Sequence, residues 1–402
     1  MIDRFKSGDF LTADRVRAAS VMLVGAYALA MIAILATSPD GMRDFRGLPL
    51  GSDFFSLWTA GKMAPELGAA SAYDPALNYQ AQQRLLDDPD PSFQPFLHPP
   101  HFLFAAIAFA ALPYAAAWLM FSGLTLAGYA AMMKKLAPQN GAMLAILAAP
   151  AVLLNLTHGQ TGFLIAGLFA AALFYLDRRP MLAGVAIGLL AFKPQYGMFF
   201  PLVLLIAGRW RTIFAAALTV AAQAGAATLA FGGAIWPAFL SKAEFARTAI
   251  IETGGVKWAA NQSLYSALRG FGAPSPAAYA AQIALALLLA ATLFRLWRAP
   301  IDQRLKSAGL AIAAFLATPY ALNYDLILLA PAIALIAGYG LEHGFLPYEK
   351  LVLSLAALVP LIALPFAEAT TIPIGLMTTL ALYATLMARV APAPARRALT
   401  AG

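Results

Sequence analysis

Residues 21–38 read VMLVGAYALAMIAILATS and carry no charged side chain. A helix of about 20 predominantly apolar residues is long enough to cross a bilayer. Similar stretches recur along the chain of 402 residues, which is 61% hydrophobic and only 11% charged, whereas soluble domains carry roughly 25% charged residues. The sequence therefore predicts an all-α polytopic membrane protein, with residues 1–402 forming a single integral membrane domain.

The apolar stretches place about twelve spans on the chain. They are expected at residues 21–38, 116–133, 142–156, 161–176, 181–192, 197–208, 212–231, 277–297, 307–320, 324–341, 351–367 and 374–387. Residues 99–114, PPHFLFAAIAFAALPY, are interpreted as an interfacial helix bent at Pro113. Counting them as a span would move Lys134 and Lys135 to the other side and reverse the charge pattern of every later loop.

The basic residues sit in short clusters between spans, and most of them then share one side with the N-terminus. Cytoplasmic loops carry an excess of Lys and Arg, so both termini are expected in the cytoplasm of an inner or plasma membrane protein. The outer side receives a first large loop at residues 39–114 and a second at residues 232–276. Because these clusters account for the net charge of +8, we expect membrane lipid and no nucleic acid as a partner.

The first outer loop contains the segment GSDFFSLWTAG, residues 51–61, with an acid at Asp53. Phe54, Leu57, Trp58 and Gly61 follow at helical spacing, which predicts an amphipathic helix along the membrane surface. Asp53 is then either the N-cap of this helix or a functional acid at the membrane edge. Further on, Asp74 followed by Pro75 predicts the start of another helix.

Four further segments place polar side chains on the same outer face. They are NLTHGQTG with His158 and Gln160, AFKPQYG with Lys193 and Gln195, WAANQSLYSALRG with Asn261, Gln262 and Arg269, and ATPYALNYDL with Tyr320, Asn323, Tyr324 and Asp325. Polar groups at membrane depth are costly and usually line a cavity or a pathway. These residues are therefore candidates for substrate binding.

Each candidate also has a simpler interpretation. Lys193 and Arg269 fit snorkelling to lipid headgroups, and His158 fits a hydrogen-bonded turn. Asn323 and Asp325 fit the cap of a helix. His98 and His101 are better explained by loop packing than by metal binding, since the chain has four histidines and no cysteine. We expect no metal site and no cofactor.

No soluble-enzyme signature for nucleotide, serine-hydrolase or zinc chemistry is present in the sequence. Two non-enzymatic alternatives stay open, a lipid or solute transporter or flippase and a non-catalytic membrane assembly subunit. Many transporters are built from repeated halves with broken helices at the midplane. The sequence shows no such repeat, and its polar groups gather on one face.

The order of several short motifs resembles a known family. After the Asp-Phe of the first outer loop come AYD, HPPH, HGQTG, GLLAFKPQ, NQSLYSALRG and TPYALNYD, within residues 53–325. This order resembles the polyprenol-phosphate-mannose-dependent mannosyltransferases of the GT-C class, glycosyltransferase family 87. A juxtamembrane helix before the second full span is typical of that class, which supports the interpretation of residues 99–114.

The resemblance implies a GT-C fold and a hexosyltransferase with its active site on the extracytoplasmic side. The expected donor is a polyprenyl-phosphate-linked sugar with mannose as the hexose, and the acceptor is a glycolipid or a glycan. Asp53 matches the acid that deprotonates the acceptor, while Gln160, Lys193, Gln195, Asn261, Gln262 and Arg269 match recurrent polar positions. Many relatives carry Trp and His after the Thr-Pro or Ser-Pro of a late span. Here residues 322–325 read LNYD, so that role falls to Tyr324, Asp325 or His158, or is absent.

These residues suggest a mechanism as a hypothesis. Asp53 would act as general base on an acceptor hydroxyl that displaces the lipid phosphate, so the anomeric carbon is inverted. Lys193 and Arg269 are the candidates for stabilising the leaving phosphate. The side chains expected to bind sugar hydroxyls or phosphate oxygens are His158, Gln160, Asn261 and Gln262.

Overall fold

The computed structural model describes residues 2–38, 40–45 and 47–391. Its α-helices are α1 (Ile2–Ser7), α2 (Ala13–Ala36), α3 (Ser52–Leu67), α4 (Pro75–Leu86), α5 (Leu103–Ala110), α6 (Tyr114–Leu136), α7 (Ala142–Leu147), α8 (Pro150–His158), α9 (Gly162–Tyr175), α10 (Pro180–Leu189), α11 (Phe200–Ile206), α12 (Trp210–Phe231), α13 (Ile235–Phe245), α14 (Leu264–Gly270), α15 (Ser275–Arg298), α16 (Gln303–Ala317), α17 (Ala330–His343), α18 (Glu349–Leu358), α19 (Ala363–Thr370) and α20 (Ile374–Val390). Short 3-10 or π-helical segments are η1 (Ala69–Tyr73), η2 (Pro100–Phe102), η3 (Leu190–Phe192), η4 (Pro194–Gly197), η5 (Ala246–Glu252), η6 (Trp258–Ala260), η7 (Asn323–Leu329) and η8 (Val359–Leu361). Over these described residues the chain forms isolated β-bridges and no β-strand, which confirms the all-α class.

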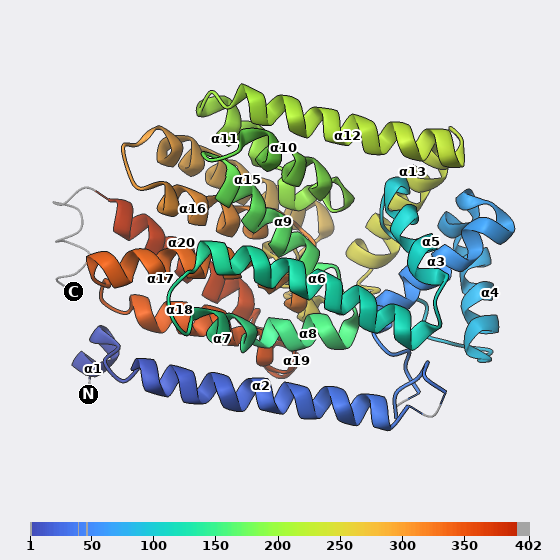
Figure 1. The fold of residues 1–402 in the computed structure, drawn as a ribbon, viewed down its shortest axis with the longest axis horizontal. Helices are drawn as coiled ribbons and strands as arrows, with labels where there is room; N and C mark the ends of the chain where they lie inside the picture. Colours follow the sequence, from blue (N-terminus) through green and yellow to red (C-terminus); the bar gives the residue numbers. More distant parts are fainter. Residues whose placement is uncertain (1, 39, 46, 392–402) are drawn as a thin grey trace.

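Several helices are long and apolar enough to cross a membrane. They are α2, α6, α12, α15 and the continuous segment Asn323–His343 formed by η7 and α17. Glu349–Leu361 and Ala363–Thr370 add a sixth if they count as one span, although the chain bends by 80° between them. Figure 1 shows the axes of α2, α6 and α12 nearly parallel along the bundle, with α6 antiparallel to the other two. The protein is therefore an integral membrane protein.

The expected number of about twelve spans is not confirmed. The remaining apolar helices are shorter, as in Gly162–Tyr175 and Pro180–Phe192. Residues 142–156 divide into α7 and α8, and Pro150 is the first residue of α8. Proline has no backbone N–H to continue the preceding helix. Hydropathy counts the apolar residues of such a stretch but does not register the break.

The helix α16 lies at the centre of the bundle. All its residues from Ser307 to Ala317 are buried, and it packs between α15, α17 and α20. Small side chains such as Ala308 and Gly309 allow this close approach on every side, since a Cβ on Gly309 would lie 2.5 Å from Leu296. The C-terminal end of α16 leads into the turn at residues 318–322. A fixed central helix therefore holds that turn in place.

The α3–α5 region differs in part from its prediction. Asp74 caps α4 and accepts from the N–H groups of Ala76 and Leu77, with Pro75 at the first helical position, as expected. Residues 100–110 form η2 and the short α5, which is shorter than the spanning helices. The helix α3 exists but does not lie on the surface. Its residues 54–61 are all buried, because the apolar stripe packs against α5 and the start of α6, while η1 and α4 also contact the helix.

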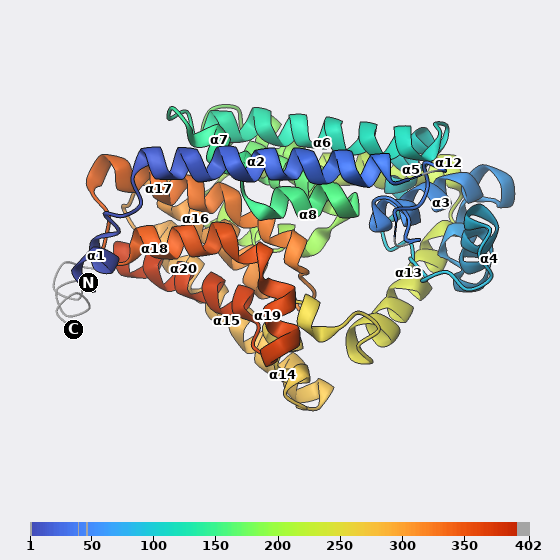
Figure 2. The same ribbon diagram turned by 90° about the horizontal axis from the view of Figure 1, so that it is seen from below.

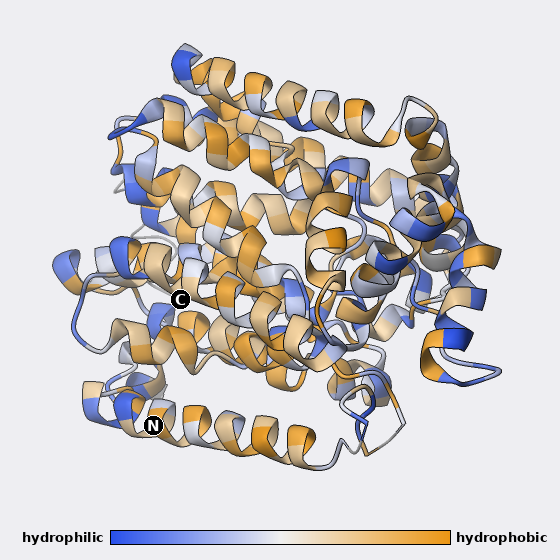
Figure 3. Cartoon of the chain, turned by 45° about the vertical axis from the view of Figure 1, so that its right-hand side comes forward, coloured by the Kyte–Doolittle hydropathy of each residue, from blue (hydrophilic) through white to orange (hydrophobic). Residues whose placement is uncertain are grey.

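Hydrophilic and hydrophobic residues separate along the bundle. Figure 3 shows apolar residues over most of the helix lengths and hydrophilic ones at helix ends and in the α3–α4 region. At one end, the N–H of Tyr348 donates to the carbonyl of Lys6, and Arg389 pairs with Glu349. The α1 helix, the start of α18 and the end of α20 thus gather together, away from the α3–α4 region (Figures 1 and 2).

Candidate active site

A cavity of about 920 Å³ lies where the α3–α5 region meets the helical bundle. It is lined by the start of α3, residues 92–99, the α8–α9 turn, the η3–η4 turn, η7, α13, η5 and the η8–α19 bend. Its polar lining contains the predicted residues Asp53, His158, Gln160, Lys193, Gln195, Tyr320, Asn323, Tyr324 and Asp325. Polar side chains that lie far apart in the sequence therefore share one cavity.

Close packing around Trp118 positions Asp53. Gly51 is the N-cap of α3 in a left-handed conformation with φ 58°, and a Cβ there would lie 2.4 Å from Trp118 Nε1. Gly159 in the α8–α9 turn also has a positive φ, and its Cβ would lie 2.5 Å from the Cβ of Phe54. Glycine alone fits such contacts without strain. These two glycines bring the first turn of α3 against the turn that carries His158 and Gln160.

Asp53 is not the N-cap of α3. It is the second residue of the helix, after Ser52, and no side-chain hydrogen bond caps the helix start. Burial raises the pKa of the Asp53 carboxyl, and the nearby charge of Asp325 adds to this. The His158 charge, a hydrogen bond from Gln160 and the Lys193 charge act in the opposite direction. A carboxyl with a raised pKa accepts a proton more readily, as a general base requires.

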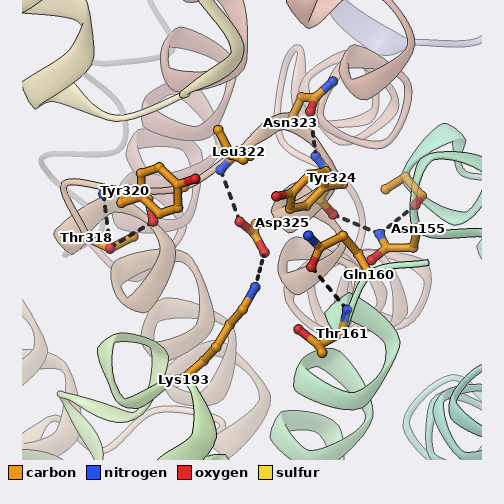
Figure 4. Close-up of polar contacts among 12 residues, drawn as sticks. Asn155, Gln160, Thr161, Lys193, Thr318, Tyr320, Leu322, Asn323, Tyr324 and Asp325 are labelled. Carbon is orange, nitrogen blue, oxygen red and sulfur yellow. Dashed lines mark hydrogen bonds and ion pairs between the residues drawn. The ribbon is translucent and has the colours of Figure 1, made fainter. Parts of the chain in front are cut away.

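The second acid of the cavity, Asp325, is fully engaged. Its Oδ1 atom accepts from Lys193 Nζ at 3.3 Å, and its Oδ2 atom accepts from the backbone N–H of Leu322 at 3.0 Å (Figure 4). The second contact caps the start of η7, so the predicted cap at Asp325 is confirmed. Lys193 pairs with a buried acid instead of snorkelling to lipid. Asp325 thus makes structural contacts through both oxygens, whereas the hydrogen bond to the Asp53 carboxyl comes from Gln160, another cavity-lining residue.

Two contacts fix η7 against α8. The side-chain amide of Asn155 donates to the carbonyls of Ala151 at 2.8 Å and Tyr324 at 2.9 Å (Figure 4). The His158 ring lies 5.6 Å from the Tyr324 ring, and its Nδ1 atom is 2.8 Å from the Leu154 carbonyl oxygen. A carbonyl oxygen only accepts, so Nδ1 carries the proton and the interpretation of His158 as a hydrogen-bonded turn residue is confirmed. His158 also lines the cavity, so both descriptions apply.

Comparison with known families decides what class of protein this is. The model of glycosyltransferase family 87 matches residues 96–319, more than half of the chain. The protein belongs to glycosyltransferase family 87. No curated protein and no solved structure gives a significant match. The matched region contains His158, Lys193 and the α13–α14 region, while Asp53 and Asp325 lie outside it. The family identifies this membrane protein as a glycosyltransferase, an enzyme with a sugar donor and an acceptor.

Three predicted residues of this glycosyltransferase do not reach the cavity. Asn261 donates to the Pro319 carbonyl and accepts from the Ala321 N–H, both at 3.0 Å. Gln262 accepts from the Gly375 N–H and donates to the Ala259 carbonyl, also at 3.0 Å. These amides brace the turn that carries Tyr320. Their polar groups are satisfied by the backbone instead of facing a substrate.

Arg269 is the third residue outside the cavity lining. Its guanidinium donates to the carbonyls of Ala273 at 2.7 Å and Glu252 at 2.9 Å, and it stacks on Trp258 with 4.9 Å to the ring centroid. Arg269 therefore ties the end of α14 to η5 and η6. It is not placed to contact a phosphate in this cavity.

Two cations of the cavity were not among the predicted residues. Lys242 and Arg247 line it from α13 and η5, beside Phe239 and Phe245. The sequence gives no motif for them, because SKAEFAR in residues 241–247 looks like an ordinary polar helix segment. Only the packing of α13 against η1 brings this segment to the cavity.

His98 also lines the cavity, and its contacts are those of a packed residue. Its ring lies 4.5 Å from the Phe102 ring, and it hydrogen-bonds to the backbone of Phe192. Burial and the nearby Lys193 charge lower the pKa of His98 to about 3. The interpretation of His98 as a packing residue is therefore confirmed. Among the described residues, no three His, Asp or Glu side chains gather as a metal-ligating group.

Proposed function

We propose that this glycosyltransferase transfers a hexose, mannose in the first instance, from a polyprenyl-phosphate donor to a membrane glycolipid or glycan. The observation that carries the proposal is that Asp53 lies in a cavity lined by both polar and apolar side chains. A polyprenyl-phosphate sugar has a headgroup that needs polar contacts and a chain that needs lipid. The donor therefore fits a cavity of this composition at the edge of a membrane protein.

The η8–α19 bend supplies the apolar side of the cavity. Pro360, Leu361, Leu364 and Pro365 line it there, and Leu361 is 53% exposed. This apolar, partly exposed bend is the side of the cavity that suits a prenyl chain. The prenyl chain would enter between this bend and the bundle, so that the sugar phosphate reaches the polar wall without leaving the membrane.

The reaction is a single displacement. Asp53 accepts the proton of an acceptor hydroxyl as its oxygen forms a bond to the anomeric carbon, while the bond from that carbon to the phosphate oxygen breaks. The polyprenyl phosphate leaves with the electron pair, and the sugar is inverted. Lys193 is the candidate for balancing the charge of the leaving phosphate, at the cost of weakening its pair with Asp325.

In this proposal the general base is Asp53 rather than Asp325. Both oxygens of Asp325 already accept from strong donors, so a proton taken there would break the pair with Lys193 or the cap of η7. Asp53 has no comparable structural duty, and its raised pKa favours proton uptake. One free base without a partner acid is the arrangement expected for an inverting enzyme that expels a phosphate.

Membrane orientation follows the distribution of basic loops. We place both termini in the cytoplasm and the cavity on the extracytoplasmic side, because cytoplasmic loops carry the excess of Lys and Arg. The elements α3 and α13, which help to line the cavity, lie towards the opposite end of the molecule from the gathered ends of α1, α18 and α20 (Figure 2), which supports this orientation.

The donor assay tests the proposal directly. Purified protein is incubated with radiolabelled polyprenyl-phosphate mannose, glucose and arabinose in parallel, with a membrane glycolipid extract as acceptor. We expect label from the mannose donor to move into the glycolipid fraction with the anomeric configuration inverted. Transfer from none of the three lipid-phosphate sugars would overturn the proposed donor. Transfer with retained configuration would overturn the single displacement.

A further inference from the structure

Lys242 is a cavity-lining cation that the proposed reaction does not use. It lies near the end of α13 and is only 2% exposed. Its Nζ atom is buried and has no hydrogen-bond partner among the described residues. The nearest groups are aromatic, since Nζ lies 5.1 Å from the ring centroid of Phe93 and 4.2 Å from that of Phe245. Lysine is rarely buried to this degree without a partner.

The surroundings of Lys242 do not stabilise its charge fully. Burial lowers the pKa of the Lys242 amine to about 8, while the nearby Asp74 acts in the opposite direction. Aromatic ring faces attract a cation only weakly compared with hydrogen-bonding acceptors. An apolar side chain of similar length would pack between Phe93 and Phe245 without this cost. The buried amine of Lys242 therefore lowers the stability of the ligand-free protein. Packing alone does not explain why a lysine occupies this position.

The other lysine and arginine side chains of the cavity are already compensated. Lys193 pairs with Asp325 at 3.3 Å, and Arg247 pairs with Glu244 and Glu252. In the described part of the chain, Lys242 has no carboxylate within ion-pair distance. Within the described ranges, Lys242 is therefore the cavity-lining cation without an ion-pair partner, and an anionic ligand that enters the cavity can bind to it.

We propose that Lys242 binds a phosphate oxygen of the lipid-linked substrate. This inference rests on the proposed function and names a second phosphate-binding residue, on a different element of the cavity lining from Lys193. Phe93, Phe239 and Phe245 line the cavity beside Lys242. A cation flanked by apolar rings matches the junction of a prenyl chain and its phosphate. The flexible stem of lysine lets the amine turn from the rings towards the ligand.

The phosphate has two possible sources, the donor and an acceptor glycolipid with a phosphate in its headgroup. Equilibrium binding of polyprenyl phosphate, the donor's leaving group, tests the first source. The KM for the acceptor extract in the transfer assay tests the second source.

The binding experiment compares four proteins in detergent. They are the wild type, Lys242→Met, Lys242→Arg and the control Lys257→Met. Lys257 lies near the same cavity, but it is 78% exposed and pairs with Glu368. Each protein is titrated with a polyprenyl phosphate and, separately, with the uncharged polyprenol of the same chain length. Thermal unfolding is measured for all four.

We expect Lys242→Met to bind polyprenyl phosphate about ten- to a hundredfold more weakly, since one charge-assisted hydrogen bond is lost. Its affinity for polyprenol should not change. Lys242→Arg should retain most of the affinity, and Lys257→Met all of it. The thermal midpoint of Lys242→Met should equal or exceed that of the wild type, because a buried amine without acceptors is removed. A purely structural lysine would show neither the ligand-specific loss nor the rescue by arginine.

The alternative outcomes separate the two proposals. An unchanged affinity for polyprenyl phosphate with a raised acceptor KM supports the site and assigns its phosphate to the acceptor. If neither quantity changes while the wild type prefers polyprenyl phosphate over polyprenol, only the role of Lys242 is overturned. If the wild type shows no such preference, the proposed donor and the role of Lys242 are both overturned.

Discussion

Gln160 and Gln262 both lie in short connections between helical segments, yet their side chains have different partners. The Gln262 side chain is 1% exposed and exchanges hydrogen bonds with the backbone of Gly375 and Ala259. Gln160 lines the cavity, where its side chain accepts from the Thr161 N–H at 3.2 Å and also hydrogen-bonds to the Asp53 carboxyl. The first amide joins two parts of the scaffold, and the second is directed at another functional side chain. What a buried amide contacts therefore distinguishes a scaffold residue from a site residue.

The same contrast separates the cations Lys193 and Arg269. Lys193 faces the cavity and pairs with a single buried acid, so a substrate can compete for its charge. Arg269 is held by two backbone carbonyls and a Trp258 ring outside the cavity. Substitutions of the cavity residues Gln160 and Lys193 should therefore lower activity. Substitutions of the scaffold residues Gln262 and Arg269 should lower stability.

The largest effect is expected for Asp53→Asn. Loss of a general base lowers a rate by about 10²- to 10⁴-fold. Stability should be retained or increased, because burial raises the pKa of this carboxyl and the folded protein disfavours its ionised form at neutral pH. Initial transfer rates and thermal unfolding of the same preparations measure both quantities. A folded Asp53→Asn protein with full transfer activity would rule out Asp53 as the base.

The next effect is expected for Lys193→Met compared with Arg269→Met. Removing a charge that stabilises a leaving group costs about 10²- to 10³-fold in kcat, and Asp325 would also be left buried without its cation. Adding Asp325→Asn should recover stability without recovering the rate. Arg269→Met should keep kcat and KM and lose about 1–3 kcal/mol of unfolding free energy, because two buried carbonyls lose a donor. A raised KM for the donor in Arg269→Met would contradict the scaffold role and indicate that Arg269 binds the donor phosphate.

A smaller effect is expected for the matched pair Gln262→Leu and Gln160→Leu. The first leaves the Gly375 N–H without an acceptor and should cost about 1–3 kcal/mol in the free energy of unfolding. The second should leave stability close to that of the wild type and lower kcat/KM by about two- to tenfold, the value of one hydrogen bond. Chemical denaturation and steady-state kinetics measure the two. Equal effects of both variants on activity would break the distinction between scaffold and site.

The smallest effect is a shift in the pH dependence of transfer. The base must be ionised, so kcat/KM rises as pH increases through the Asp53 pKa, and burial places this rise above the usual aspartate value of about 3.9. The Gln160 hydrogen bond lowers the pKa of Asp53, so Gln160→Leu should move the rise to higher pH. Gln262→Leu should leave the midpoint where it is. A midpoint that moves to lower pH in Gln160→Leu would contradict the assigned contact.

The membrane class, the helical cap at Asp74 and most of the cavity's polar residues could be predicted from the sequence alone. These follow from local properties, because hydropathy and capping depend on neighbouring residues. The sequence did not determine the number of spans. Breaks such as the one before Pro150, and the 80° bend near Ile362, depend on how each helix packs.

The tertiary structure decided which candidates share the cavity. Lys193 and Asp325 are separated by 132 positions, and Asn155 reaches the backbone of Tyr324 across 169 positions. No local pattern encodes such contacts. The roles of Asn261, Gln262 and Arg269 as scaffold, and the presence of Lys242 at the cavity, depend on where the whole chain places their partners. A polar side chain has the same identity in every environment, but its partners decide whether it braces the fold or remains available to a substrate.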